Sequence, residues 1–270
     1  MFLTHQTEPS WEHPMRKAFL CRTFLLILVL LVSASGLFAQ GKFIPKRERD
    51  QRIEEIKQLG RQLLAEPDTF KRAKIRALMV KKDVIYDDED RPRGDGFAVP
   101  AFKELYENAS EDLNARLQAV IGLATLKSPD ANAPLITALR DKNAAIQLLA
   151  IQSLEVKRVK TAGKGLIRLL RSRDTNIVAA AAGCLAAIGH DENDQAAKVM
   201  VRLMTRHLQR LRNTPTTQEA KRAEHERVIE VLGRSCGTLI DGLDWAPGQT
   251  MKDLEREVNK FMKWLESKGG

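Results

Sequence analysis

Three stretches decide the fold of this chain: DLNARLQAVIGL at 112–123, NAAIQLLAIQSL at 143–154 and DTNIVAAAAGCL at 174–185. They come into register at a shift of 31 residues, with an apolar residue at the fourth position, alanine at the eighth and leucine at the twelfth. Positions four apart lie on one face of a helix. We therefore predict three equivalent helices, in which the central alanine lets neighbouring helices approach closely.

Each predicted helix has a start signal and a shorter apolar segment before it. Asp112, Asn143 and Asp174 share one column, and their side chains are preferred N-caps because they accept a hydrogen bond from a free backbone N–H. Gly189 follows the third helix, where glycine is favoured. The upstream segments also match at the same shift, through Leu105, Ile136 and Ile167, through Leu135 and Leu166, and through Leu139 and Leu170. Each unit is therefore predicted to be a helix–turn–helix pair.

The third unit carries the most complete pattern, with Leu169-Leu170, Asp174, Ile177, Ala181, Leu185 and Ile188-Gly189. This pattern resembles HEAT-like repeats, including the set named after phycobilisome lyases, over residues 100–189. The resemblance implies an all-α fold, an armadillo-like α-solenoid of stacked antiparallel helix pairs that forms a HEAT-like superhelix. The lyase name transfers no chemistry. The family's arginine column is broken here, because Arg116 is followed by Gln147 and Val178, so a continuous arginine–aspartate ladder is not expected.

The N-terminal region has the pattern of a secretory signal. A basic stretch from Met15 to Arg22 precedes the apolar run at 24–32, and small residues follow at 33–36. We expect residues 1–39 to be a signal peptide, with Met15 as its true start and cleavage after Gly36 or Ala39. The apolar run is shorter than the roughly 20 residues of a membrane span. The alternative is an uncleaved N-terminal anchor, so the protein is expected to be exported: periplasmic, secreted or membrane-anchored. The tail, with Leu243 to Gly248 and then Trp264-Leu265, also resembles some exported bacterial HEAT repeat domain-containing proteins.

The predicted repeats lie between two less regular segments. Residues 47–82 are expected to form an N-terminal helical cap of two helices, the second capped by Asp68. Residues 83–99 are expected to form an acidic loop with four consecutive acids at 87–90, and the alternatives for it are a solvated loop, a partner contact and a weak cation site of the calcium kind. Residues 190–270 are predicted to form a C-terminal cap of long helices at 195–212, 219–232 and 251–267, the second ended by Gly233.

Lysine and arginine outnumber aspartate and glutamate by 44 to 35, which gives a formal net charge of +9. Stacked repeats would bring several basic side chains together, either as a solvated helix face or as a contact for an anion or an acidic partner. Nucleic acid is not expected, because aromatic stacking residues are scarce at 5% of the chain. The candidate contact residues are Arg158, Lys160, Lys164, Arg168, Arg171, Arg173, Arg202, Arg206 and Arg210.

No catalytic, cofactor-binding or metal-binding motif is found in the sequence. His190, His207 and His225 have no helical metal-site spacing, and there is no Cys-x-x-Cys, nucleophile elbow or phosphate loop. Cys184 and Cys236 are predicted to be free thiols, with a disulfide as the alternative. We expect a non-catalytic scaffold or adaptor in the cell envelope that binds an unidentified protein through its solenoid surface. The alternatives are a peripheral binder of anionic lipid or polymer through a basic face, with membrane insertion only through the N-terminal segment, and an enzyme of unrecognised type.

Overall fold

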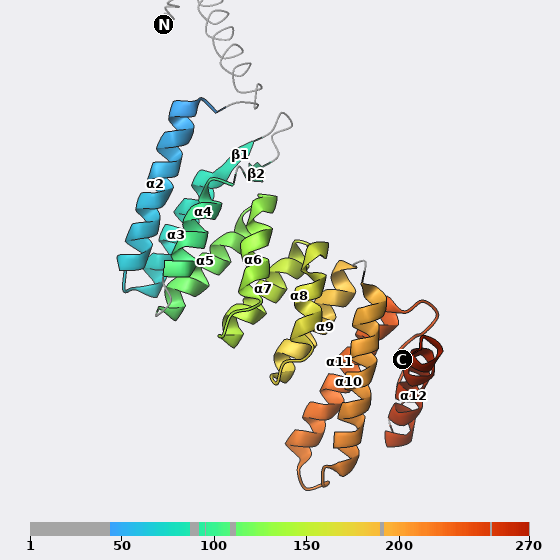
Figure 1. Ribbon diagram of the computed structural model, residues 1–270. Helices are drawn as coiled ribbons and strands as arrows, with labels where there is room; N and C mark the ends of the chain where they lie inside the picture. Colours follow the sequence, from blue (N-terminus) through green and yellow to red (C-terminus); the bar gives the residue numbers. More distant parts are fainter. Residues whose placement is uncertain are drawn as a thin grey trace, which may run out of the picture.

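The computed structural model describes residues 44–86, 92–94, 96–108, 112–189, 192–248 and 250–269. Within these ranges the fold is all-α except for one short hairpin (Figure 1). The helices are α2 (Lys46–Ala65), α3 (Thr69–Asp83), α4 (Ala98–Asn108), α5 (Leu113–Thr125), α6 (Asn132–Ala138), α7 (Ala144–Val156), α8 (Gly163–Leu169), α9 (Thr175–Ile188), α10 (Asn193–Asn213), α11 (Glu219–Leu239) and α12 (Met251–Ser267). Short 3-10 turns, η1 (Pro129–Ala131) and η2 (Lys160–Ala162), precede α6 and α8.

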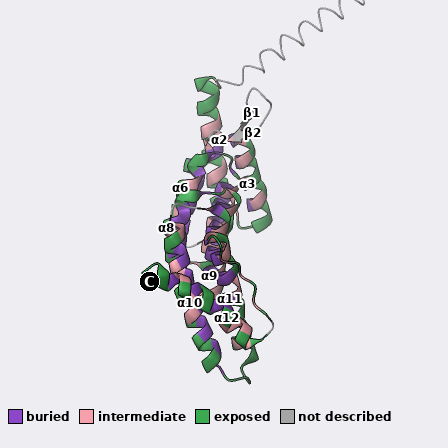
Figure 2. Ribbon diagram, turned by 90° about the vertical axis from the view of Figure 1, so that its right-hand side faces the viewer, coloured by how far each residue is buried: buried purple, intermediate pink, exposed green. Residues whose placement is uncertain are grey.

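The helices form two rows that run along the molecule. In one row α3, α5, α7, α9 and α11 pack in series, each on the next (Figure 1). The helices α2, α4, α6, α8 and α10 each pack on the helix that follows them in the sequence, which gives consecutive helix pairs. The buried residues lie between the rows, while the outward faces are half-buried or exposed (Figure 2). The helix α12 packs on α10 at the C-terminal end.

The predicted start signals of the repeat helices are confirmed. The Asp112 side chain accepts a hydrogen bond from the Ala115 N–H, and Asp174 accepts from the Asn176 N–H. Asn143 accepts from the N–H groups of the two residues after Ala144. The repeated apolar columns are buried as well: Ala115, Ala119, Leu123, Ile146, Ala150, Leu154, Ile177, Ala181 and Leu185 have at most 2% of their surface exposed. Removing this apolar surface from water is the main favourable contribution to folding of these units.

Side chains at the turns join successive helix pairs. Arg72 of α3 donates to both carboxylate oxygens of Asp112, at 3.0 and 2.6 Å. In the next unit, Arg116 of α5 and Tyr106 of α4 both donate to Asp141 in the turn before α7. The Arg116–Asp141 pair is an arginine–aspartate contact between neighbouring units, although the interrupted arginine column did not predict a continuous series of such pairs. The ladder stops there because the next side chain in the column, Gln147, donates to the Asp141 carbonyl at 2.8 Å.

Three predicted boundaries differ in the structure. The helix α11 continues past Gly233 to Leu239, because this glycine lies against the indole of Trp245 and does not end the helix. Within 83–99, β1 (Val84–Tyr86) pairs antiparallel with β2 (Pro92–Gly94), and α4 already begins at Ala98. The four acids at 87–90 lie outside the described residues, as does the predicted export segment 1–39. Among the helices that the structure describes, none combines the length and the apolar character needed to cross a bilayer.

Candidate functional site: an arginine-lined hollow

A hollow of about 530 Å³ lies where the turn between α8 and α9 faces α10. We call it the arginine hollow, because five of the predicted contact residues line it. Its lining residues are Leu170, Arg171, Ser172, Arg173, Thr175, Val178, Val199, Arg202, Leu203, Arg206, His207 and Arg210. The residues from α10 form one wall of the hollow, and the α8–α9 turn with the first turns of α9 forms the other.

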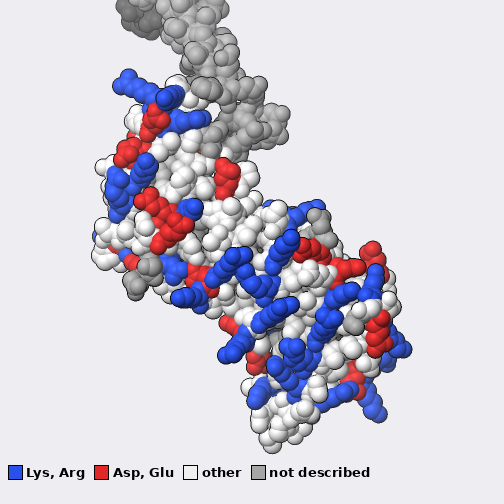
Figure 3. Space-filling view, in the orientation of Figure 1, with Lys and Arg blue, Asp and Glu red and all other residues white. Residues whose placement is uncertain are grey.

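The wall on α10 follows from the amphipathic pattern of that helix. Arg202, Arg206 and Arg210 are four residues apart, so they share one exposed face. The opposite face, with Met200, Val201, Met204, Leu208 and Leu211, is buried against the stack. In the orientation of Figure 1, blue side chains cover much of the face over α8 and α10 (Figure 3). The burial of one face therefore fixes the three arginines as a row at the edge of the hollow.

The opposite wall carries Arg171 and Arg173 on a short turn. The turn is set by the end of α8 at Leu169 and by the Asp174 cap of α9, so the chain has little freedom between these points. Ser172 accepts a hydrogen bond from the Asp174 N–H at 3.1 Å, which holds the same turn. Both arginines are exposed at their positions on this wall.

The five arginines of the hollow have no carboxylate partner within the described ranges. The ion pairs in this part of the molecule involve other cations, such as Lys164 with Glu192 at 3.5 Å and Arg212 with Glu255 at 2.7 Å. One nearby carboxylate, Glu224, accepts a hydrogen bond from the Thr175 hydroxyl at 2.9 Å. The cluster is therefore a concentration of like charge that an incoming anion would neutralise.

The floor of the hollow is apolar. Leu170 and Val178 are buried, while Val199 and Leu203 are half-buried and pack against the core. Apolar surface at the bottom of a hollow with a charged rim is the arrangement found in sites that bind a group with an apolar part and a few charges. A bound partner could therefore place charged side chains against the rim and apolar side chains against the floor.

A pair of buried histidines lies beside the floor and was missed from the sequence. His207 of α10 lines the hollow, and its Nδ1 lies 3.2 Å from Nδ1 of His225 on α11. One ring nitrogen must donate and the other accept, so the accepting imidazole must be neutral. Burial, then the charges of His225 and Arg210, lower the pKa of His207 to about 4. Burial also lowers the pKa of His225.

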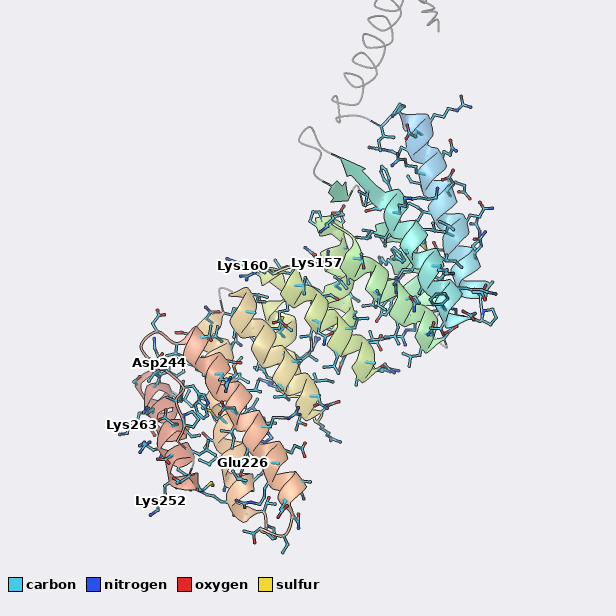
Figure 4. The ribbon with its side chains drawn as sticks, turned by 180° about the vertical axis from the view of Figure 1, so that it is seen from behind. Lys157, Lys160, Glu226, Asp244, Lys252 and Lys263 are labelled. Carbon is cyan, nitrogen blue, oxygen red and sulfur yellow. The ribbon has the colours of Figure 1, made fainter. Side chains whose placement is uncertain are left out.

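The other four predicted contact residues do not line the hollow. Arg158 and Lys160 lie in the turn before α8, at the opposite end of this helix from the hollow, and Lys160 is labelled at that edge in Figure 4. Lys164 pairs with Glu192, and Arg168 is exposed on α8. The structure therefore places five of the nine candidate contact residues around the hollow and the other four outside its lining.

The described residues contain no group of three or more histidine, cysteine, aspartate or glutamate side chains placed to hold a metal ion. Cys184 of α9 and Cys236 of α11 are both free and buried, as predicted. Burial raises the pKa of Cys184 to about 12 and raises that of Cys236 as well. Because the thiolate is the reactive form, neither thiol is suited to act as a nucleophile near neutral pH.

Comparison with known proteins gives little further information. No protein-family model matches the chain, and no curated protein matches it either. Among solved structures, the chain is similar to an engineered protein known from a crystal structure, with 17% identity over 79% of this chain and 97% of that one, and a TM-score of 0.36. At this level of similarity, nothing about fold or function transfers.

Proposed function

We propose that this chain is an exported α-solenoid of HEAT-like repeats that serves as a non-catalytic scaffold in the cell envelope. On this proposal it binds another protein along its helical surface. The two rows of helices support the solenoid, because a solenoid is built from units that contact their sequence neighbours and leave long faces open to solvent. The signal-like pattern at 15–39 supports export.

The arginine hollow is the observation that carries the proposal. Five guanidinium groups that have no carboxylate partner among the residues the structure describes lie around an apolar floor, and together they form a surface suited to a partner of opposite charge. Arginine is enriched at protein interfaces because its planar group forms two parallel hydrogen bonds to a carboxylate. The shifted pKa values near the hollow are explained by burial of a hydrogen-bonded pair, so they do not require a catalytic role.

Affinity capture from the envelope fraction tests this proposal. Tagged full-length protein is expressed from its own start, crosslinked in intact cells and purified, and bound proteins are identified by mass spectrometry. We expect at least one partner protein, at reduced yield with the variant R202E/R206E/R210E. If wild-type protein recovers no partner with or without the crosslinker, the scaffold proposal is wrong. The mass of the mature N-terminus, measured on the same sample, tests export and cleavage.

A second candidate is peripheral binding of anionic lipid or polymer through the same basic face. The observation that favours it is the breadth of the basic surface over α8 and α10 (Figure 3). Electrostatic attachment of this kind is strongest at low ionic strength, where screening is weak. Sedimentation with phosphatidylglycerol vesicles at low salt tests it, and absence of binding under those conditions rejects it.

A further inference from the structure

We infer that the arginine hollow receives an extended acidic segment of a partner protein, in which carboxylate and apolar side chains alternate. This inference rests on the proposed function, since it names the chemistry of the partner segment. It is carried by the spacing of the rim arginines and by the apolar floor between them.

The first step is the spacing along α10. Arg202, Arg206 and Arg210 are four residues apart, and a helix rises about 1.5 Å per residue, so neighbouring arginines are about 6 Å apart along the axis. Side chains on one side of an extended chain repeat every two residues, which is about 6.7 Å. Carboxylates at every second position of an extended segment therefore have nearly the same spacing as this row of arginines.

The second step is the division between rim and floor. Successive side chains of an extended segment point to opposite sides, so one set faces the apolar floor of Val178, Val199 and Leu203. The alternate set points to the rim, where the three arginines of α10 face Arg171 and Arg173 on the other wall. This geometry requires apolar residues at one set of positions and aspartate or glutamate at the other.

The floor also distinguishes this partner from other anions. The flat surface of a bilayer can contact the rim arginines, but it does not place apolar groups on a recessed floor beneath them. A single-stranded nucleic acid would need aromatic side chains for its bases to stack on, and tryptophan, tyrosine and phenylalanine are absent from the residues that line the hollow. The combination of charge and shape therefore favours a polypeptide.

Synthetic peptides test the inference on the full-length protein. Fluorescein-labelled Leu-Glu-Leu-Glu-Leu-Glu is compared by fluorescence anisotropy with Leu-Leu-Leu-Glu-Glu-Glu, which has the same composition in blocks, and with Leu-Gln-Leu-Gln-Leu-Gln. We expect the alternating acidic peptide to bind at least about tenfold more tightly than either control, and its affinity to fall as salt is added.

Two charge-matched variants locate the binding site. R202Q/R206Q/R210Q removes three charges from the hollow and should weaken binding of the alternating peptide by about 10- to 100-fold, since each exposed ion pair contributes modestly. R47Q/K57Q/K81Q removes three charges from exposed positions on α2 and α3 and should leave the affinity unchanged. Circular dichroism of both variants verifies that the helical fold is retained.

Several outcomes would overturn the inference. Equal affinity for the alternating and block peptides, or equal weakening by both variants, would show non-specific attraction to a basic surface. Binding to phosphatidylglycerol vesicles with no binding to either acidic peptide would assign the face to lipid. If affinity capture recovers the same partner with wild type and with R202Q/R206Q/R210Q, the scaffold proposal stands and the assignment to the hollow is wrong.

Discussion

The packing of Trp245 on Gly233 gives a prediction whose magnitude can be worked out from the structure. A Cβ atom at position 233 would lie 2.2 Å from Cδ2 of the Trp245 indole and 2.3 Å from its Cε3. Real contacts of this kind are not that short, so Gly233→Ala must displace the ring. The ring also packs on Phe261, with centroids 5.9 Å apart, and its Nε1 donates to Glu230 at 2.8 Å.

Three effects contribute to the change in unfolding free energy. Alanine in a helix interior is favoured over glycine by about 1 kcal/mol. Overpacking costs about 1–3 kcal/mol, and loss of the hydrogen bond to the partly exposed Glu230 costs about 1 kcal/mol. The costs exceed the gain, so we expect Gly233→Ala to destabilise the C-terminal end by roughly 2 kcal/mol.

A matched variant provides the control. Gly183 lies inside α9, and a Cβ atom built there meets nothing within 4 Å. We expect Gly183→Ala to stabilise the protein by up to about 1 kcal/mol through helix propensity alone. Urea unfolding is followed by circular dichroism and by the fluorescence of Trp245 and Trp264. If both substitutions stabilise the protein equally, the indole does not lie on Gly233 and the account of the C-terminal end is wrong.

Three more predictions follow from other contacts. The pKa of His207 is depressed from its ordinary 6.5 to about 4, so the unfolded chain binds the proton more readily. The unfolding free energy should be full above pH 6.5 and fall by about 3 kcal/mol as the pH drops to 4. Urea unfolding across this range measures the slope, which His207→Gln should flatten. Arg158 has a left-handed φ of 52°, so Arg158→Gly should raise stability by about 1 kcal/mol in thermal unfolding, and a decrease would contradict the strain argument. Asp141→Ala removes the shared partner of Arg116 and Tyr106 and should cost about 2–3 kcal/mol, whereas a neutral effect in urea unfolding would mean that these bonds contribute nothing.

The sequence predicts the repeat helices well because their signals are local. An N-cap such as Asp174 acts on backbone groups within its own turn, and an apolar column such as Ile146 and Ala150 sets one helix face directly. The same signals recur in each unit at a fixed interval, so each occurrence supports the assignment of the others. The pairing of helices follows from these faces, since each must be buried against a neighbour.

The errors arise where a distant residue decides the outcome. Glycine is the residue expected just past the end of a helix, so the sequence predicts a helix end at Gly233. Its actual role is to leave room for Trp245, which lies beyond the helix in the sequence. His207 and His225 are on different helices, and their contact depends on how α10 and α11 are rotated against each other. The sequence signal for this contact was that both histidines lie on the buried face of a helix. A search for metal-binding spacing within one helix does not detect it.

The candidate site was predictable in part for the same reason. The row at Arg202, Arg206 and Arg210 follows from helical periodicity, so the sequence identifies it. Which other cations join the row depends on which end of α8 faces α10. The turn after α8, which carries Arg171 and Arg173, faces α10, whereas the turn before α8, which carries Arg158, does not face it. That choice is made by tertiary packing and is absent from the local pattern.

Site-specific photocrosslinking in intact cells tests the central claim most directly. A photoreactive amino acid replaces Ser172 at the hollow, or Thr238 at an exposed position of α11 as the control. We predict a discrete adduct with one protein from position 172, absent at 238 and lost when R202Q/R206Q/R210Q is added. No protein adduct at 172, or the same adducts from both positions, would contradict the claim that the arginine hollow is the surface that binds a partner.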